Sequence, residues 1–150
     1  MPTFTIRSFN ETDTDRLVQL WKDCGLVVPQ NDPCKDISRK LSVNPDWLLV
    51  GELNGRLVAS CMVGYEGHRG WINYLAVHPD YQRKGYARKL MERAELILRK
   101  AGCPKVNLQV RSSNTKVIRF YESIGFAEDK VLSFGKRLQK DENQQVEPDR

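Results

Sequence analysis

The sequence has no long hydrophobic run. Its uncharged apolar segments fall well short of the roughly 20 residues that a membrane-spanning helix needs, so we expect no membrane partner. The segment Met1–Arg7 also lacks the basic stretch followed by an apolar one that marks a secretion signal. We therefore expect a protein that stays in the cytoplasm.

Metal-binding residue types are scarce and scattered. There are two histidines, and the four cysteines Cys24, Cys34, Cys61 and Cys103 form no Cys-x-x-Cys pair. Structural zinc sites combine such ligands at short spacings. We therefore expect no bound metal, and reduced thiols of the kind usual in the cytoplasm.

What the sequence has is the composition of an ordinary folded domain. Its 150 residues are 40% hydrophobic and 29% charged. A chain of this length buries enough surface to fold without metals or disulfides, so we expect one domain over residues 1–150. Residues 139–150 are polar and poor in apolar side chains, and we expect them to form a flexible tail.

Positive charge is in excess. The formal net charge is +5, which favours an anionic partner without distinguishing nucleic acid, a membrane surface and a phosphorylated cofactor. The basic residues are densest between positions 83 and 105, and they do not interleave with stacking aromatics as in nucleic-acid-binding surfaces. We therefore expect an anion site near the start of that segment and no nucleic-acid partner. The basic residues of the segment are Arg83, Lys84, Arg88, Lys89, Arg93, Arg99, Lys100 and Lys105.

Apolar periodicity and turn residues predict both strands and helices. Asp32 before Pro33 predicts the start of a helix that ends before Pro45. Asn54-Gly55 predicts a tight turn between strands at 47–53 and 56–63. The remaining elements are expected as helices near 13–24, 87–101 and 117–124, and as strands near 3–9, 71–77, 105–110 and 127–134. This order predicts an α+β fold, with a mixed, mostly antiparallel central sheet flanked by about four helices.

The segment Leu75–Leu90 carries the clearest functional pattern. A strand runs into a short loop with Gly85, and the loop opens directly into the long helix. Unpaired amides and the positive end of the helix dipole make such a helix start an anion site, and small residues let a phosphate approach the backbone. The loop lacks the glycine and lysine patterns of ATP and NAD sites, so a pyrophosphate of another cofactor fits better. The alternative is a basic helix start with a turn glycine.

Two motifs resemble those of the GNAT superfamily of N-acetyltransferases. Gln82–Ala87, after Leu75–Pro79, matches that family's acetyl-CoA motif, Gln/Arg-x-x-Gly-x-Gly/Ala. Asn114 with Phe120–Phe126 matches its second motif. The resemblance covers residues 3–138. It implies a GNAT-like sheet with a V-shaped cofactor cleft between the strand that ends at Val77 and the strand that begins near residue 105.

The resemblance also implies roles for individual residues. Acetyl-CoA would be the co-substrate, with its pantetheine arm paired to the backbone of Ala76 and Val77. A primary amine would attack the thioester directly, and a backbone amide such as that of Val77 would stabilise the oxyanion that forms. Tyr121 corresponds to the residue beside the thioester sulfur. The further cofactor-binding residues implied are Arg83, Lys84, Gly85, Tyr86, Ala87 and Arg88 at the pyrophosphate, and Asn114 near the pantetheine arm.

For a general base that deprotonates the amine, position in the sequence is the only indication. Glu66, just beyond the strand that ends near Val63, is the candidate, with His68 behind it. A solvated turn residue is the alternative at both positions. His78 precedes Pro79, and we expect it to shape the loop.

Two other functions stay open at this point. One is a domain that binds coenzyme A without catalysis, against which the presence of Tyr121 argues. The other is a nucleic-acid binder, against which the location of the basic residues argues. The sequence leaves open the amine acceptor, a small molecule or a protein, and whether the chain forms a homodimer.

Overall fold

The computed structural model describes residues 3–141. Within them the chain forms two compact units, residues 3–107 with Asp141 and residues 108–140. The elements in chain order are β1 (Phe4–Ser8), η1 (Glu11–Asp13), α1 (Thr14–Asp23), α2 (Pro33–Leu41), η2 (Pro45–Trp47), β2 (Leu48–Leu53), β3 (Arg56–Tyr65), β4 (Gly70–Val77), η3 (Pro79–Tyr81), α3 (Tyr86–Lys100), β5 (Val106–Asn107) and α4 (Thr115–Ser123).

The first unit is built on a five-stranded sheet in the order β1-β2-β3-β4-β5. Neighbouring strands run antiparallel except β5, which runs parallel to β4. The β2–β3 hairpin turns at Asn54 and Gly55, whose φ angles of 53° and 76° suit the predicted two-residue turn. The expected α+β fold, a mostly antiparallel sheet with four α-helices, is confirmed.

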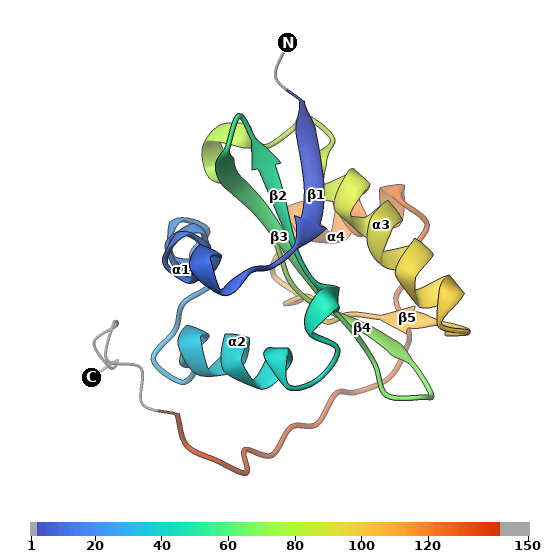
Figure 1. The fold of residues 1–150 in the computed structure, drawn as a ribbon. Coiled ribbons are helices and arrows are strands. Elements are labelled where there is room, and N and C mark those ends of the chain that lie inside the picture. The colour runs from blue at the N-terminus through green and yellow to red at the C-terminus, as the bar shows by residue number, and fades with distance from the viewer. Residues whose placement is uncertain (1–2, 142–150) are drawn as a thin grey trace. The chain divides into compact units, whose positions relative to one another are not determined.

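Helices cover both faces of this sheet. Figure 1 shows α1 and α2 on one side of the strands and α3 on the other. As predicted, α2 begins at Pro33, and the Asp32 carboxylate caps it by accepting from the amides of Cys34 and Lys35. The apolar stripes of the helices fill the core. The buried cluster on the α1 side includes Leu17, Leu20, Trp21, Ile37, Leu48, Val50 and Ala76, and the buried positions of α3 are Leu90, Met91, Ala94 and Leu98.

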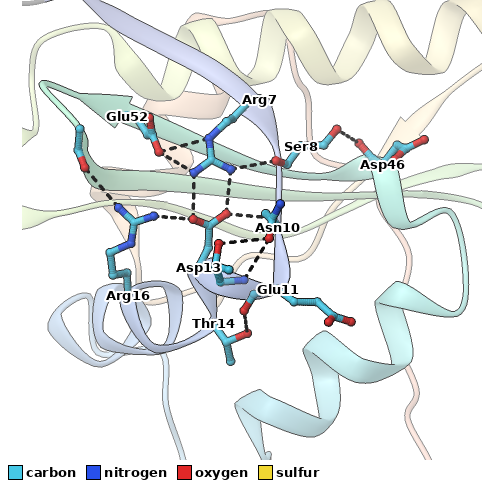
Figure 2. A network of polar contacts seen from close by, with 11 residues as sticks. Arg7, Ser8, Asn10, Glu11, Asp13, Thr14, Arg16, Asp46 and Glu52 are labelled. Atoms are coloured by element: carbon cyan, nitrogen blue, oxygen red, sulfur yellow. Dashed lines mark hydrogen bonds and ion pairs between the residues drawn. The ribbon is translucent and has the colours of Figure 1, made fainter.

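A polar network fixes the start of α1 against the sheet (Figure 2). The Asp13 carboxylate, 1% exposed, accepts two hydrogen bonds from the Arg7 guanidinium at 2.7 and 2.8 Å. It also accepts one from the Asn10 amide at 2.8 Å and one from Arg16. Arg7 in turn pairs with Glu52 of β2. The network therefore joins β1, β2 and the entry to α1.

Two strand predictions near the C-terminal end differ from the structure. The strand expected at 105–110 is confined to Val106–Asn107, and no strand follows α4 in the described part of the chain. The apolar residues Val131, Leu132 and Phe134 of the expected strand 127–134 are 77%, 82% and 90% exposed. An apolar pattern shows that a segment could pack, but a strand also needs a hydrogen-bonded neighbour. The prediction of a last strand is therefore wrong.

The expected flexible tail falls mostly outside the described residues, which end at Asp141. Asp141 itself is buried, and its carboxylate accepts from Arg39 Nη2 at 2.8 Å and from the Asp32 amide at 3.4 Å. The four cysteines are free thiols. Among residues 3–141, no helix combines the length and apolar character that a bilayer span requires.

Candidate active site

The outer edge of β4 is open over most of its length. The β4–β5 ladder has only the pairs Gly70–Val106 and Trp71–Asn107. Within residues 3–107, the stretch of β4 from Ile72 to Val77 therefore has no strand beside it on that edge. β5 itself ends at Asn107, which is also the last residue of this part of the first unit.

A β-bulge interrupts β4 at its centre. Ser60 of β3 pairs with Ala76 and Met62 pairs with Asn73, so Tyr74 and Leu75 together face one residue of β3. Tyr74 has a φ of 52°, which is rare for a bulky side chain and costs conformational energy. The bulge breaks the simple alternation that the sequence pattern assumes.

Several contacts hold Tyr74 in this conformation. Its ring stacks on Trp21 of α1 with centroids 3.8 Å apart, and its hydroxyl donates to Asp36 Oδ2 of α2 at 2.6 Å. The Ser60 hydroxyl donates to the Tyr74 carbonyl at 2.7 Å, and the Trp21 indole N–H donates to Ser60 Oγ at 3.0 Å. Burial, and then the contact with Asp36, raises the pKa of Tyr74, so its hydroxyl stays protonated at neutral pH.

The backbone of Val77 faces the open edge, whereas that of Ala76 does not. The His78 amide donates to the Val58 carbonyl of β3 at 2.8 Å. Because backbone groups alternate in direction along an antiparallel strand, those of Ala76 also face β3 and those of Val77 face outward. The Leu75 carbonyl shares its peptide group with the Ala76 N–H, so it points outward as well. The Ala76 amide and carbonyl therefore do not face the open edge, where the resemblance implied a contact with the cofactor, whereas the Leu75 carbonyl does.

The Val77 carbonyl already has two donors. Gln82 Nε2 donates to it at 3.0 Å and Cys24 Sγ lies 3.5 Å away. A carbonyl oxygen has two lone pairs, so these side chains occupy both and leave the Val77 N–H as the group turned to the edge. Burial raises the pKa of Cys24 to about 11, which keeps it a neutral donor rather than a thiolate.

The loop after β4 has the backbone geometry expected of an anion site. Arg83 and Gly85 both have positive φ, 64° and 82°, and such turns direct successive amides toward one point. Gly85 is the N-cap of α3 and no described side chain caps that end; the first helical hydrogen bond runs from the Lys89 amide to the Gly85 carbonyl at 3.1 Å. Arg83, Lys84 and Arg88 are exposed around this helix start.

Two contacts brace this loop. The Tyr86 ring stacks on Phe4 of β1 with centroids 4.2 Å apart, so Tyr86 anchors the helix start while Ala87 follows it in the first turn. His78 Nδ1 accepts from the Asp80 amide at 3.1 Å, and His78 Nε2 lies 3.3 Å from Asp23. Both ring nitrogens are thus engaged, in agreement with a loop-shaping role for His78.

Glu66 lies at the wrong end of β4. It sits in the β3–β4 turn, where its carboxylate accepts from the His68 and Arg69 amides. These hydrogen bonds lower the pKa of Glu66, which makes it a weaker base. β4 has eight residues, and at about 3.3 Å per residue this separates the turn from Val77 by roughly 20 Å. The structure does not bring Glu66, or His68 beside it, to the open edge near Val77.

The second unit holds the other two candidates. Asn114 is the N-cap of α4, and its side-chain oxygen accepts from the Val117 amide at 3.4 Å. Tyr121 lies on α4, and its ring makes edge contacts with the rings of Phe120 and Phe126, at centroid distances of 5.1 and 5.5 Å. Asn114 therefore has a capping role that the sequence interpretation missed, although an Asn directly before a helix is the usual signal for one.

The comparisons with known proteins agree with this geometry. The family model described as the acetyltransferase (GNAT) family matches residues 8–126. An acetyltransferase of Sodalis glossinidius is 48% identical over 138 residues, which is 91% of this chain and 97% of that protein. An acetyltransferase of Pectobacterium atrosepticum is 46% identical over 136 residues, which is 91% of this chain and 96% of that protein.

Solved structures show the same fold. The ribosomal-protein-S18-alanine N-acetyltransferase from Escherichia coli has a TM-score of 0.73 and 27% identity, covering 85% of this chain and 80% of that one. An aminoglycoside N-acetyltransferase in complex with CoA has a TM-score of 0.74 and 18% identity, covering 93% and 97%. The chain belongs to the acetyltransferase (GNAT) family, whose members are N-acetyltransferases that use acetyl-CoA as co-substrate.

Proposed function

We propose that the protein transfers an acetyl group from acetyl-CoA to a primary amine by direct attack of the amine on the thioester. The observation that carries this proposal is the position of the anion site. The positive-φ turn and the start of α3 follow the end of the open edge of β4, with only the short η3 between them. An extended arm and a pyrophosphate joined to it can therefore lie along consecutive parts of the chain.

The pyrophosphate would lie at the start of α3. The amides of Gly85, Tyr86 and Ala87 and the helix dipole favour negative charge there. Arg83, Lys84 and Arg88 surround the same point with positive charge. The pantetheine arm would continue along the outward-facing backbone of Val77 and Leu75. Asn114 and Tyr121 are carried over from the resemblance as further contacts, with Asn114 near that arm.

The chemical step would need three groups. An amine attacks the thioester carbonyl, an outward-facing β4 amide stabilises the oxyanion, and coenzyme A leaves as a thiolate. Tyr121 would hydrogen-bond or protonate that thiolate. A phenol with a pKa near 10 is a weaker acid than a thiol near 8.5, so hydrogen bonding as charge develops on sulfur is the main contribution we propose.

The acceptor amine must lose a proton, and Glu66 is too distant to take it. A lysine side chain with a pKa of about 10.4 is almost fully protonated at neutral pH, whereas an α-amine near 7.7–8.0 is partly neutral. We propose an α-amine acceptor, on a peptide or a small molecule, because it needs a base least. The cytoplasmic location and a homodimer stay predictions from the sequence.

A matched pair of glycine variants tests the phosphate site. Gly85 and Gly102 lie at the two ends of α3, share a φ of 82°, and a Cβ added at either meets no atom within 4 Å. Gly85→Val and Gly102→Val should therefore cost similar conformational strain, about 1–2 kcal/mol or somewhat more for a branched residue. Only Gly85→Val should weaken acetyl-CoA binding, by about tenfold or more, because its side chain blocks approach to the backbone amides.

Calorimetry with acetyl-CoA measures this difference, and release of free thiol in the presence of a panel of amines measures transfer. Equal acetyl-CoA affinity in the two variants would contradict the phosphate site. Tight binding without thiol release for any amine would instead assign the chain as a coenzyme A-binding module.

A further inference from the structure

The open edge of β4 presents a backbone amide whose direction is fixed from the opposite side of the strand. The peptide group between Tyr74 and Leu75 is trans, as no described peptide bond is cis. In a trans peptide the carbonyl and the N–H point in opposite directions. Ser60 holds the Tyr74 carbonyl from the β3 side, so the Leu75 N–H points away from β3.

This hydrogen bond is the end of a buried chain of donors. The Trp21 indole N–H donates to Ser60 Oγ, and the Ser60 hydroxyl donates to the Tyr74 carbonyl. Trp21 and Ser60 are both fully buried. Water therefore cannot replace Ser60 at the indole, so loss of the Ser60 hydroxyl would leave the buried indole N–H without this partner and would remove the donor to the Tyr74 carbonyl.

The conformation that this chain holds is a strained one. Tyr74 has a φ of 52°, and a rotation of the Tyr74–Leu75 peptide would move toward the conformations that bulky residues prefer. The same rotation would turn the Leu75 N–H away from the open edge. Stacking on Trp21 and the hydrogen bond to Asp36 hold the Tyr74 side chain, and the Ser60 hydroxyl is the side-chain donor that holds the peptide itself.

We propose that Trp21 and Ser60 are positioning residues that aim the Leu75 amide at the acetyl oxygen of bound acetyl-CoA. The proposal rests on the proposed function. It assigns the oxyanion contact to Leu75 rather than to Val77, and it places the control of that contact in residues from α1 and β3 that touch neither substrate.

Binding of the acetyl group distinguishes a positioning role of Trp21 and Ser60 from a purely structural one. Coenzyme A and acetyl-CoA share every contact except those with the acetyl group. Loss of the Leu75 contact should therefore weaken acetyl-CoA and leave coenzyme A unchanged, while general damage to the sheet should weaken both equally. Transfer should suffer more than binding, because charge on the carbonyl oxygen is largest in the transition state.

The test compares Ser60→Ala with the control Cys61→Ala. Cys61 is also buried and occupies the next position of β3, but it lies outside the chain of donors. Ser60→Ala should lower kcat by about 10²-fold, the size seen when one oxyanion donor is lost, and should raise the KM for acetyl-CoA by a smaller factor. It should also reduce the ratio of acetyl-CoA to coenzyme A affinity, measured by calorimetry. Cys61→Ala should lower the melting temperature and leave kcat and that ratio unchanged.

Two further variants keep the proposal testable if Ser60→Ala does not fold. Ser60→Thr keeps the hydroxyl and should retain most of kcat, and Trp21→Phe keeps an aromatic ring but loses the indole donor, so its kcat should fall. Wild-type kcat in Ser60→Ala or in Trp21→Phe, or an equal loss of affinity for both ligands, would overturn the positioning role. Wild-type protein that binds neither coenzyme A nor acetyl-CoA would overturn the proposed function and this inference with it.

Discussion

Replacing Asp13 by asparagine should destabilise the protein in a strongly pH-dependent way. Asp13 is 1% exposed and accepts hydrogen bonds from Arg7, Asn10 and Arg16. Hydrogen bonds from Arg7, followed by those from the other two residues, lower the pKa of Asp13 to about 2 against the usual 3.8, although burial opposes the shift. A difference of almost two pKa units corresponds to about 2 kcal/mol in favour of the charged, folded state.

The sign of the pH dependence follows from the lowered pKa. Above about pH 5 the carboxylate is charged in both the folded and unfolded states, and the full stabilisation of about 2 kcal/mol is present. As the pH falls, the unfolded chain takes up a proton first, and the contribution is about half lost near pH 3 and nearly gone below pH 2. The asparagine side chain is neutral and has the same shape, so the variant lacks this contribution at every pH.

Urea unfolding of wild type and Asp13→Asn at pH 7, 5, 4 and 3 measures the effect. The difference in the free energy of unfolding should be near 2 kcal/mol at pH 7 and shrink toward pH 3. Other acidic groups titrate in both proteins and cancel in this difference. Glu11→Gln, in the same turn but exposed, is the matched control and should change stability by less than about 0.5 kcal/mol. A difference that is constant from pH 7 to pH 3 would refute the reasoning.

Three further predictions concern catalysis. Tyr121→Phe should lower kcat by about 10²- to 10⁴-fold with little change in acetyl-CoA affinity. The control Tyr65→Phe removes a phenol from the β3–β4 turn and should leave kcat unchanged. A Tyr121→Phe variant with wild-type turnover would show that the ring only packs. Glu66→Gln should keep kcat within about twofold of the wild-type value, since the Glu66 carboxylate accepts from the turn amides roughly 20 Å from Val77. A tenfold loss of kcat would show that Glu66 takes part in catalysis. Peptides with a free α-amine should react faster at pH 7 than peptides whose only amine is a lysine side chain. The ratio of the two rates should fall toward pH 9, because the two amines have pKa values near 8 and about 10.4. A rate ratio independent of pH would point to a base in the site.

Local signals predicted most of the elements. Asp32-Pro33 fixes the start of α2 through its own side chain, and Asn54-Gly55 adopts the two positive φ angles that the hairpin needs. The loop from Gln82 to Ala87 forms a helix start with an exposed glycine, as its pattern indicates. In each case the residues that carry the signal are the ones that make the contact, so neighbours in sequence are sufficient for the prediction.

Predictions that depended on distant partners were less successful. The apolar pattern at 127–134 could not show whether a neighbouring strand would pair with it, and no such pairing forms in the described chain. Glu66 is a different case, because the predicted hairpin already placed it at the far end of the strand from Val77. The prediction for Glu66 considered its proximity to the strand in sequence and left out the length of an extended strand.

The bulge explains why the motif alone could not define the site. Residues 75–88 predict where the phosphates of the cofactor bind, because loop and helix start are adjacent in sequence. The direction of the Leu75 amide depends instead on Trp21, Ser60 and Tyr74, which come from three different elements. α1 brings Trp21 to this point, and the Asp13 network fixes the start of α1 on β1 and β2. A motif can therefore indicate the family and the cofactor, while the geometry that orients the reacting carbonyl arises only when the helices pack on the sheet.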